Sequence, residues 1–173
     1  PDLRGVVFSL VAQEGDRAIY DTLWDLEERA TLQEEKMRLL GALARFRQKE
    51  LVEETLQRTL SPAIRSQDSV LVVAAIAAHG HGRDLAWDFV KANWSEFDRR
   101  YGSGGFGVMR LVGITGAFTS QERADDVEDF FKEHPAPAAH RTIQQSLERI
   151  KLNIKWLERN GQELRDWFDN PAQ

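Results

Sequence analysis

The sequence contains no cysteine, which excludes disulfide bonds and metal sites with thiolate ligands and is compatible with a reducing compartment. Long apolar runs are also missing, because the longest, residues 70–78, falls far short of the roughly 20 residues that a membrane-spanning helix needs. Residues 1–4 lack the organisation of a signal peptide. We therefore expect a cytoplasmic protein that has no membrane partner.

An excess of basic residues is missing as well. The chain carries 23 Lys and Arg against 28 Asp and Glu, a formal net charge of −5, so it lacks the electrostatic footprint of a nucleic-acid-binding protein. The basic residues around Arg45, Arg47 and Lys49 are most simply a solvated surface. With 42% hydrophobic and 29% charged residues, the composition is that of a globular domain with no nucleic-acid partner.

Apolar residues recur with helical periodicity throughout the chain. The longest stripe steps by four, three, four and three residues between polar positions, and consists of Ile143, Leu147, Ile150, Ile154 and Leu157. A second group of large apolar side chains is predicted to be core rather than a base-stacking platform: Trp87, Phe89, Trp94 and Phe97. No stretch alternates as a half-buried strand would, so the sequence predicts an all-α fold.

Capping residues and Gly or Pro mark the expected helix boundaries. Asp16 is predicted to cap a helix, and Thr31 with Glu34 and Thr119 with Glu122 read as capping boxes. The helices are expected at residues 3–14, 17–29, 32–46, 49–59, 67–79, 83–100, 106–117, 120–133, 138–159 and 161–169. Short connections favour stacked antiparallel pairs in one HEAT-like α-solenoid domain over residues 1–173, with a compact bundle as the alternative.

Two motifs resemble functional sites but lack the context that the chemistry needs. His79 and His81 flank a glycine and have no third ligand nearby, whereas zinc needs at least three protein ligands. Residues 102–107 are rich in glycine, but a charged helix precedes them and no Lys follows, unlike a phosphate-binding loop. The interpretation left open is that the amino end of the helix at 106–117 faces a ligand carboxylate. No H-E-x-x-H motif occurs in the sequence.

Several phrases in fixed order carry a resemblance to a known family. They are Ile64–Asp68, Gly82–Trp94, Phe130–Pro137, Gln145–Ile150, Asn153–Leu157 and Trp167-Phe168. In this order and spacing, residues 30–169 resemble the C-terminal domain of M1 zinc aminopeptidases, with the greatest similarity to the puromycin-sensitive branch.

The resemblance implies a role without a catalytic site of its own. In these enzymes a thermolysin-like domain carries the zinc, H-E-x-x-H and the motif that holds the substrate amine, and none of these elements occurs here. The fragment is therefore expected to need no cofactor and to be inactive alone. It would enclose the peptide cavity of the catalytic domain in the same polypeptide and gate access to the zinc.

The resemblance also points to candidate residues for peptide binding. Some relatives place an Arg near the end of the helix that corresponds to 32–46, which makes Arg45 and Arg47 candidates for the peptide carboxylate. Phe106 and Arg110, in the helix after the Gly-rich turn, are the other candidates. Catalytic and metal-binding residues are not expected in this chain.

One alternative of a different class stays open at this point. The chain could be an independent helical-repeat module that holds a protein partner on a concave face. The absence of an initiator Met favours a fragment of a longer chain. If the domain packs on a catalytic domain, one of its faces is expected to expose apolar surface.

Overall fold

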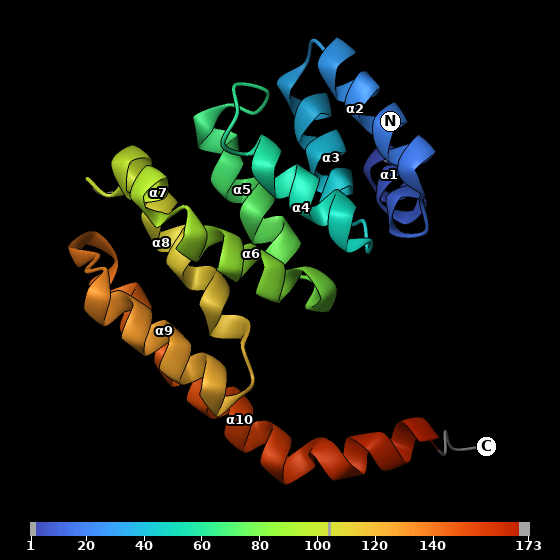
Figure 1. Cartoon of the computed structure of the whole chain (residues 1–173). Coiled ribbons are helices and arrows are strands. Elements are labelled where there is room, and N and C mark those ends of the chain that lie inside the picture. Colours follow the sequence, from blue (N-terminus) through green and yellow to red (C-terminus); the bar gives the residue numbers. More distant parts are fainter. Residues whose placement is uncertain (1–2, 104, 170–173) are drawn as a thin grey trace. The chain divides into compact units, whose positions relative to one another are not determined.

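The computed structural model describes residues 3–103 and 105–169, and every regular element within them is helical. These residues form ten α-helices and two short 3-10 helices, with no strand among them, which confirms the all-α helical-repeat fold (Figure 1). None of the described helices combines the length and the apolar character that crossing a membrane requires. The chain divides into two compact units, residues 1–100 and 101–173. That both form one domain of HEAT-like type stays a prediction.

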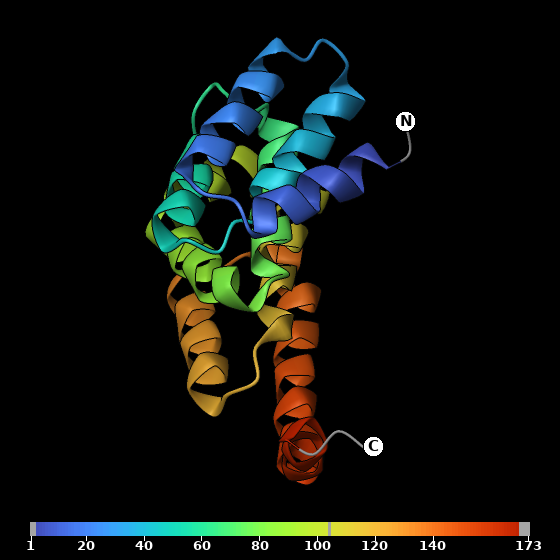
Figure 2. The same cartoon turned by 90° about the vertical axis from the view of Figure 1, so that its right-hand side faces the viewer.

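The first unit is built from antiparallel helices that pack in pairs. Helix α3 packs on α1 and α2, and α6 packs on α4 and α5 (Figures 1 and 2). The helices are α1 (Arg4–Gln13), α2 (Arg17–Arg29), α3 (Gln33–Leu43), α4 (Lys49–Arg58), α5 (Ser66–Ala77), α6 (Gly80–Ala92) and α7 (Trp94–Tyr101), the last ending at the first residue of the second unit.

Aromatic residues form the centre of the first unit. Trp87, Phe46 and Tyr20 are fully buried, and the Tyr20 ring meets the Phe46 ring edge-on at 5.2 Å between centroids. The Tyr20 hydroxyl lies 3.0 Å from the Thr55 hydroxyl, so its polar end is satisfied inside the core. The predicted core role of the aromatic group around Trp87 is confirmed, because all four of its members are buried.

The second unit consists of four helical elements around the long C-terminal helix. Its elements are α8 (Phe106–Gly113), η1 (Ile114–Ala117), α9 (Gln121–Glu133), η2 (Pro137–Ala139) and α10 (His140–Asp169). Helix α10 packs on η1, α8 and α9, and Figure 2 shows α9 running beside its first half. Asn153 ties α10 to the η1 end, since its Nδ2 donates to the carbonyls of Gly116 at 3.1 Å and Phe118 at 3.0 Å.

Several predicted helix boundaries are wrong. The helix expected over 83–100 begins earlier, at Gly80, and is divided at Asn93, whose Nδ2 donates to the Phe89 carbonyl at 2.9 Å and caps α6. The break expected at Gly161 does not occur, and α10 runs through it in one helix. Glycine weakens a helix interior by about 1 kcal/mol relative to alanine, which is too little to end a helix whose neighbouring turns are intact.

The caps follow the prediction at one helix and depart from it at two. The Asp16 side chain accepts a hydrogen bond from the Ile19 amide at 3.1 Å, as expected. Thr31 does not cap α3, because the helix begins at Gln33 and Leu32 is its N-cap residue. Leu32 forms no side-chain hydrogen bond there. At α9 the cap is Ser120 instead of Thr119, and its hydroxyl accepts from the Arg123 amide at 3.3 Å.

Candidate functional site

The turn between α3 and α4 places Arg45 and Arg47 at the surface. Phe46, between them, is fully buried and anchors the turn, so the two Arg side chains point to solvent. Arg47 Nη2 lies 3.4 Å from Glu14 Oε1, so this charge already has a partner. Arg45 makes no ion pair with any residue that the structure describes, and it is the member of the pair with its charge available.

Two imidazoles lie at the start of α6, and the charge of Arg45 acts on the first of them, His79. Burial, followed by the charges of Arg45 and His81, lowers the pKa of His79 from its ordinary value of 6.5. The rings of His79 and His81 stack with their centroids 5.6 Å apart and their planes 7° from parallel. His79 is the N-cap of α6 and forms no side-chain cap, so the positive end of this helix dipole lies at the same place.

These three side chains form the Arg45–His79–His81 cluster, which has the properties of a receptor for a carboxylate. The guanidinium of Arg45 offers a forked pair of donors, and the imidazoles can donate further hydrogen bonds. Burial and, after it, the charges of Arg45 and His81 lower the pKa of His79, and a bound anion would offset the second of these causes. Sequence reasoning missed this grouping, because it set the histidines aside as an incomplete metal pair.

Phe106 and Arg110 lie on one face of α8 in the second unit. Phe106 is 86% exposed, and Arg110, one turn further on, is exposed and forms no ion pair with a described residue. Gly105, the N-cap, has a φ of 100°, and a Cβ on Gly107 would come within 2.8 Å of the Tyr101 ring. The glycines therefore serve the turn and its packing; Gly104, in the same motif, lies outside the described residues.

The structure brings the predicted residues together in two pairs. Arg45 and Arg47 share one turn of the first unit, and Phe106 and Arg110 share one helix face of the second. The helix expected at 106–117 is shorter, because η1 begins at Ile114. That any of the four residues binds a peptide stays a prediction.

The second unit also contains an open apolar groove of about 620 Å³ where α9, the Pro-rich connector and α10 meet. Its lining includes the apolar side chains of Phe131, Ile143 and Leu147 and the charged side chains of Glu128 and Lys132. The Lys132 ammonium is 3.5 Å from Glu128 and 2.9 Å from Asp129, and the hydrogen bond with Asp129 is the main cause of its raised pKa. Because this cation is already paired, the groove suits a carboxylate less well than the Arg45–His79–His81 cluster does.

The residues that the structure describes form no group suited to a zinc ion. Across residues 3–103 and 105–169, no three side chains of His, Asp or Glu come together in a way that would hold a metal ion. The stacked pair of His79 and His81 has no third ligand, which a protein zinc site requires.

Comparison with known proteins places the chain in a family. Residues 1–152 match the model of the ERAP1-like C-terminal domain. Aminopeptidase M1-A of Oryza sativa subsp. japonica is 32% identical over 91% of this chain, and aminopeptidase N of Bos taurus is 32% identical over 97% of it. Aminopeptidase M1 of Arabidopsis thaliana is 32% identical over 91% of the chain. The chain spans 18% of the length of each of these relatives. The predicted resemblance is confirmed, and the chain belongs to the ERAP1-like C-terminal domain family of M1 aminopeptidases.

Proposed function

We propose that this chain is the substrate-enclosing domain of a zinc aminopeptidase, and that the Arg45–His79–His81 cluster receives the C-terminal carboxylate of the peptide. The observation that carries the proposal is the exposed Arg45 guanidinium, which forms no ion pair with a described residue and whose charge acts on His79 at the amino end of α6, where the helix dipole adds positive potential. The chemistry of peptide hydrolysis belongs to a catalytic domain of the same polypeptide, which supplies the zinc.

The physical task of such a domain is to hold and enclose a peptide without reacting with it. Closing over an active site excludes water and fixes the orientation of the substrate. A charge-assisted hydrogen bond from Arg45 to the far end of the peptide would favour peptides whose length brings the amino end to the zinc. Gating of the zinc site and the cytoplasmic location stay predictions.

The test is an Arg45→Ala substitution in the full-length aminopeptidase. Hydrogen bonds to charged groups contribute about 1.5–3 kcal/mol, so KM for a peptide with a free carboxylate should rise roughly ten- to hundredfold. KM for the same peptide with an amidated C-terminus should change little, because the amide carries no charge to lose.

The matched control is Arg47→Ala, which removes the Arg that Glu14 already pairs. It should leave KM for both peptides within about twofold, in line with the small energies of exposed ion pairs. A second readout is pH, since the preference for the free carboxylate should grow as pH falls below 6.5 and His79 gains its proton. Equal KM values for acid and amide peptides with the unaltered enzyme would rule the proposal out.

A further inference from the structure

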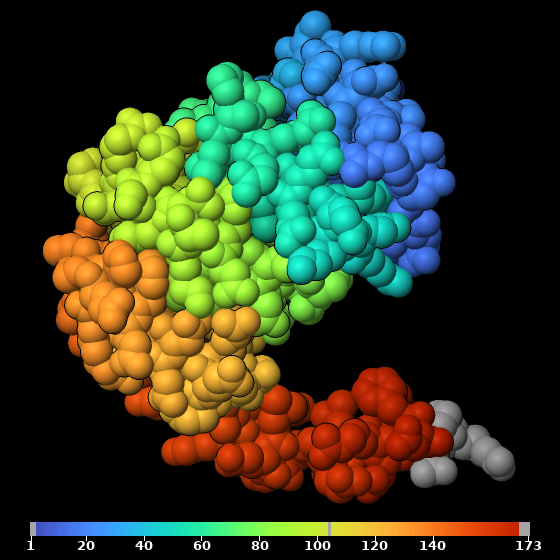
Figure 3. Space-filling model, viewed as in Figure 1, coloured from blue at the N-terminus to red at the C-terminus, as the bar shows by residue number. Residues whose placement is uncertain are grey.

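An open pocket of about 570 Å³ lies in the first unit, between the turn that joins α4 to α5 and the last turn of α7. Its lining is mostly polar and includes three guanidinium groups, those of Arg65, Arg99 and Arg100, so it is named the arginine pocket. Arg100 Nη2 donates to the Leu60 carbonyl at 2.8 Å and so joins the two sides of the pocket. Figure 3 shows both segments at the surface of the first unit.

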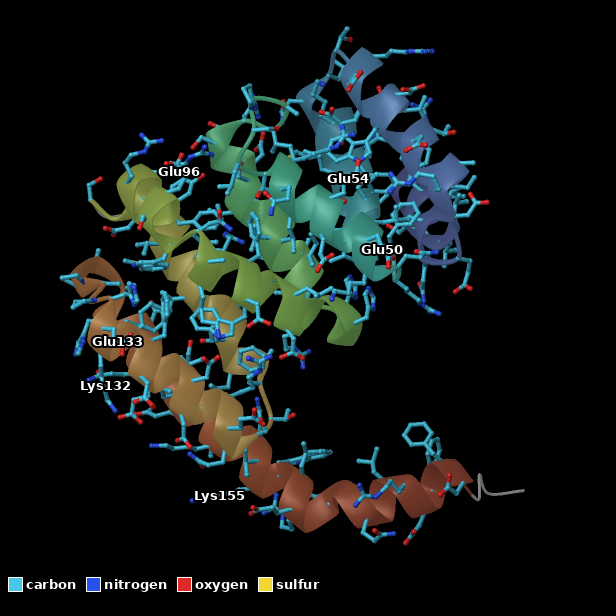
Figure 4. All side chains as sticks on the ribbon, viewed as in Figure 1. Glu50, Glu54, Glu96, Lys132, Glu133 and Lys155 are labelled. Carbon is cyan, nitrogen blue, oxygen red and sulfur yellow. The ribbon has the colours of Figure 1, made fainter. Side chains whose placement is uncertain are left out.

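Each of the three arginines is held in place by a carboxylate and keeps donors that no carboxylate uses. Arg65 Nε donates to Asp68 Oδ2 at 2.8 Å. Arg99 donates to both oxygens of Glu96, at 2.8 and 2.7 Å, and Arg100 Nε donates to Glu96 as well (Figure 4). Among the described residues, no partner is recorded for the two terminal nitrogens of Arg65 or for one terminal nitrogen of each of the other two. The guanidinium groups are therefore oriented in advance and can still bind an anion.

The arginine pocket carries more positive than negative charge. Two carboxylates, Asp68 and Glu96, pair with the three guanidinium groups, which leaves one positive charge without a counter-charge. The amino end of α5 adds to this potential, because its first residue, Ser66, lines the pocket and its N-cap residue makes no side-chain cap. At the groove of the second unit the ratio is the reverse, since one ammonium there meets two carboxylates.

The arrangement of the donors suits a phosphate group better than a carboxylate. A carboxylate is planar, and one guanidinium fork satisfies its two oxygens, as Arg99 does for Glu96. A phosphomonoester presents three terminal oxygens in different directions and carries a charge of about −1.5 to −2 at pH 7. Three guanidinium groups and a helix amino end supply donors for all of these oxygens.

We propose that the arginine pocket binds a small soluble phosphomonoester, whose phosphate oxygens accept hydrogen bonds from Arg65, Arg99 and Arg100. Leu60, Pro62 and Ile64 supply apolar surface for the carbon skeleton of such a ligand. The pocket volume falls within the range of about 300–1,000 Å³ that is usual for small-molecule sites. This inference goes beyond peptide binding and does not depend on the Arg45–His79–His81 cluster.

The test is a titration of the 173-residue chain with glycerol 3-phosphate at constant ionic strength, followed through the NMR signals of the arginine Nε–H groups. The signals of Arg65, Arg99 and Arg100 should shift together and saturate, with a dissociation constant on the order of 1 mM. Acetate should bind at least about fivefold more weakly, because it has fewer oxygens and less charge. Thermal unfolding should move to higher temperature as glycerol 3-phosphate is added, because the ligand binds the folded chain.

Arg99→Gln is the informative variant, because this side chain is 68% exposed and its loss should leave the fold intact. Its affinity for glycerol 3-phosphate should fall about five- to tenfold. Arg99→Lys keeps the charge without the fork, and its affinity should fall by less than about threefold. The matched control is Arg29→Gln, which removes the same charge from a paired and exposed arginine of α2, and it should stay within about twofold of the unaltered chain.

The proposal is overturned if the shifts grow without saturating, or if the Arg29 and Arg99 variants weaken binding equally, because either result means a diffuse response to charge. It is also overturned if the chain binds vesicles that contain phosphatidic acid but does not bind glycerol 3-phosphate, since the phosphate would then belong to a lipid surface. The proposed function is tested separately, through KM of the full-length enzyme for acid and amide peptides, so failure of one proposal leaves the other standing.

Discussion

The two units differ in how completely they bury their large aromatic side chains. In the first unit, large aromatic side chains such as Trp87 and Phe46 are enclosed completely, whereas the second unit leaves Trp167 and Phe168 at the surface of its longest helix. Some aliphatic side chains of the first unit are exposed as well, among them Leu10 on α1 at 62% and Leu32 at 67%. An apolar stripe therefore indicates which side of a helix packs, but not whether the packing partner lies in the same unit.

Buried charge also separates the units. The first unit buries Glu27 with Lys36 Nζ at 3.0 Å, and buries Asp68 with Arg65 Nε at 2.8 Å. Within the described part of the second unit, the buried polar side chains are hydroxyls instead. Because a buried charge is tolerated only with its partner in place, the first unit is expected to be the more sensitive to single substitutions.

The largest contrast is expected between two tryptophan truncations. Trp87→Ala would leave a cavity in a closed core and should lower the free energy of unfolding by about 3–5 kcal/mol. Trp167→Ala removes a 59% exposed ring and should change it by less than about 0.5 kcal/mol in the 173-residue chain. Urea unfolding followed by circular dichroism measures both, and losses of equal size would contradict the difference between the units.

Two glycine substitutions should act in opposite directions. A Cβ at Gly82 would lie 2.6 Å from the Ile76 carbonyl oxygen, and since that atom is backbone, Gly82→Ala should cost about 1–3 kcal/mol. At Gly161 the nearest atom is the end of the Arg165 side chain at 3.9 Å, so Gly161→Ala should add about 0.5–1 kcal/mol through helix propensity. Thermal unfolding of the two variants checks the signs, and a stabilising Gly82→Ala would show that this close approach is relieved at no cost.

The smallest expected effect is a pH dependence confined to the first unit. Hydrogen bonds from Arg99 and Arg100 lower the pKa of Glu96, on α7 (Figure 4), from 4.5 to about 2. Because the folded-state pKa is depressed, the stabilisation is present above pH 4.5 and is lost as pH falls toward 2.

Glu96→Gln should therefore flatten the decline of the urea midpoint between pH 5 and 2. Glu163→Gln, on an exposed carboxylate of α10 with no ion pair to a described residue, serves as the matched control and should leave that decline unchanged. An acid decline that is identical in Glu96→Gln and the unaltered chain would mean that the ion pairs of α7 contribute nothing to stability.

Much of the fold could be predicted because helix signals are local. The Asp16 cap needs only neighbouring residues and is confirmed. The stripe from Ile143 to Leu157 lies on one helix as expected, but Ile150 is the member that is fully buried, and Leu157 is 41% exposed. The end of α6 at Asn93 could not be predicted in the same way. The Asn93 side chain caps α6 by donating to the Phe89 carbonyl, and this cap forms only when α7 starts a new helix at Trp94. The Arg45–His79–His81 cluster was missed for a related reason, since Arg45 is remote from the two histidines in sequence and its charge acts on His79 only through the packing of the first unit.

The sequence by itself determined the all-α class, the apolar side of α10 and the family to which the chain belongs, because these depend on periodicity and on residue order. Tertiary structure alone decided that Arg47 is paired with Glu14 while the charge of Arg45 acts on His79. It also decided that α10 makes its last recorded hydrogen bonds to η1 and its end through Asn153. The physical reason is that charge pairing and burial depend on distances between segments remote along the chain, and local propensity carries no information about those distances.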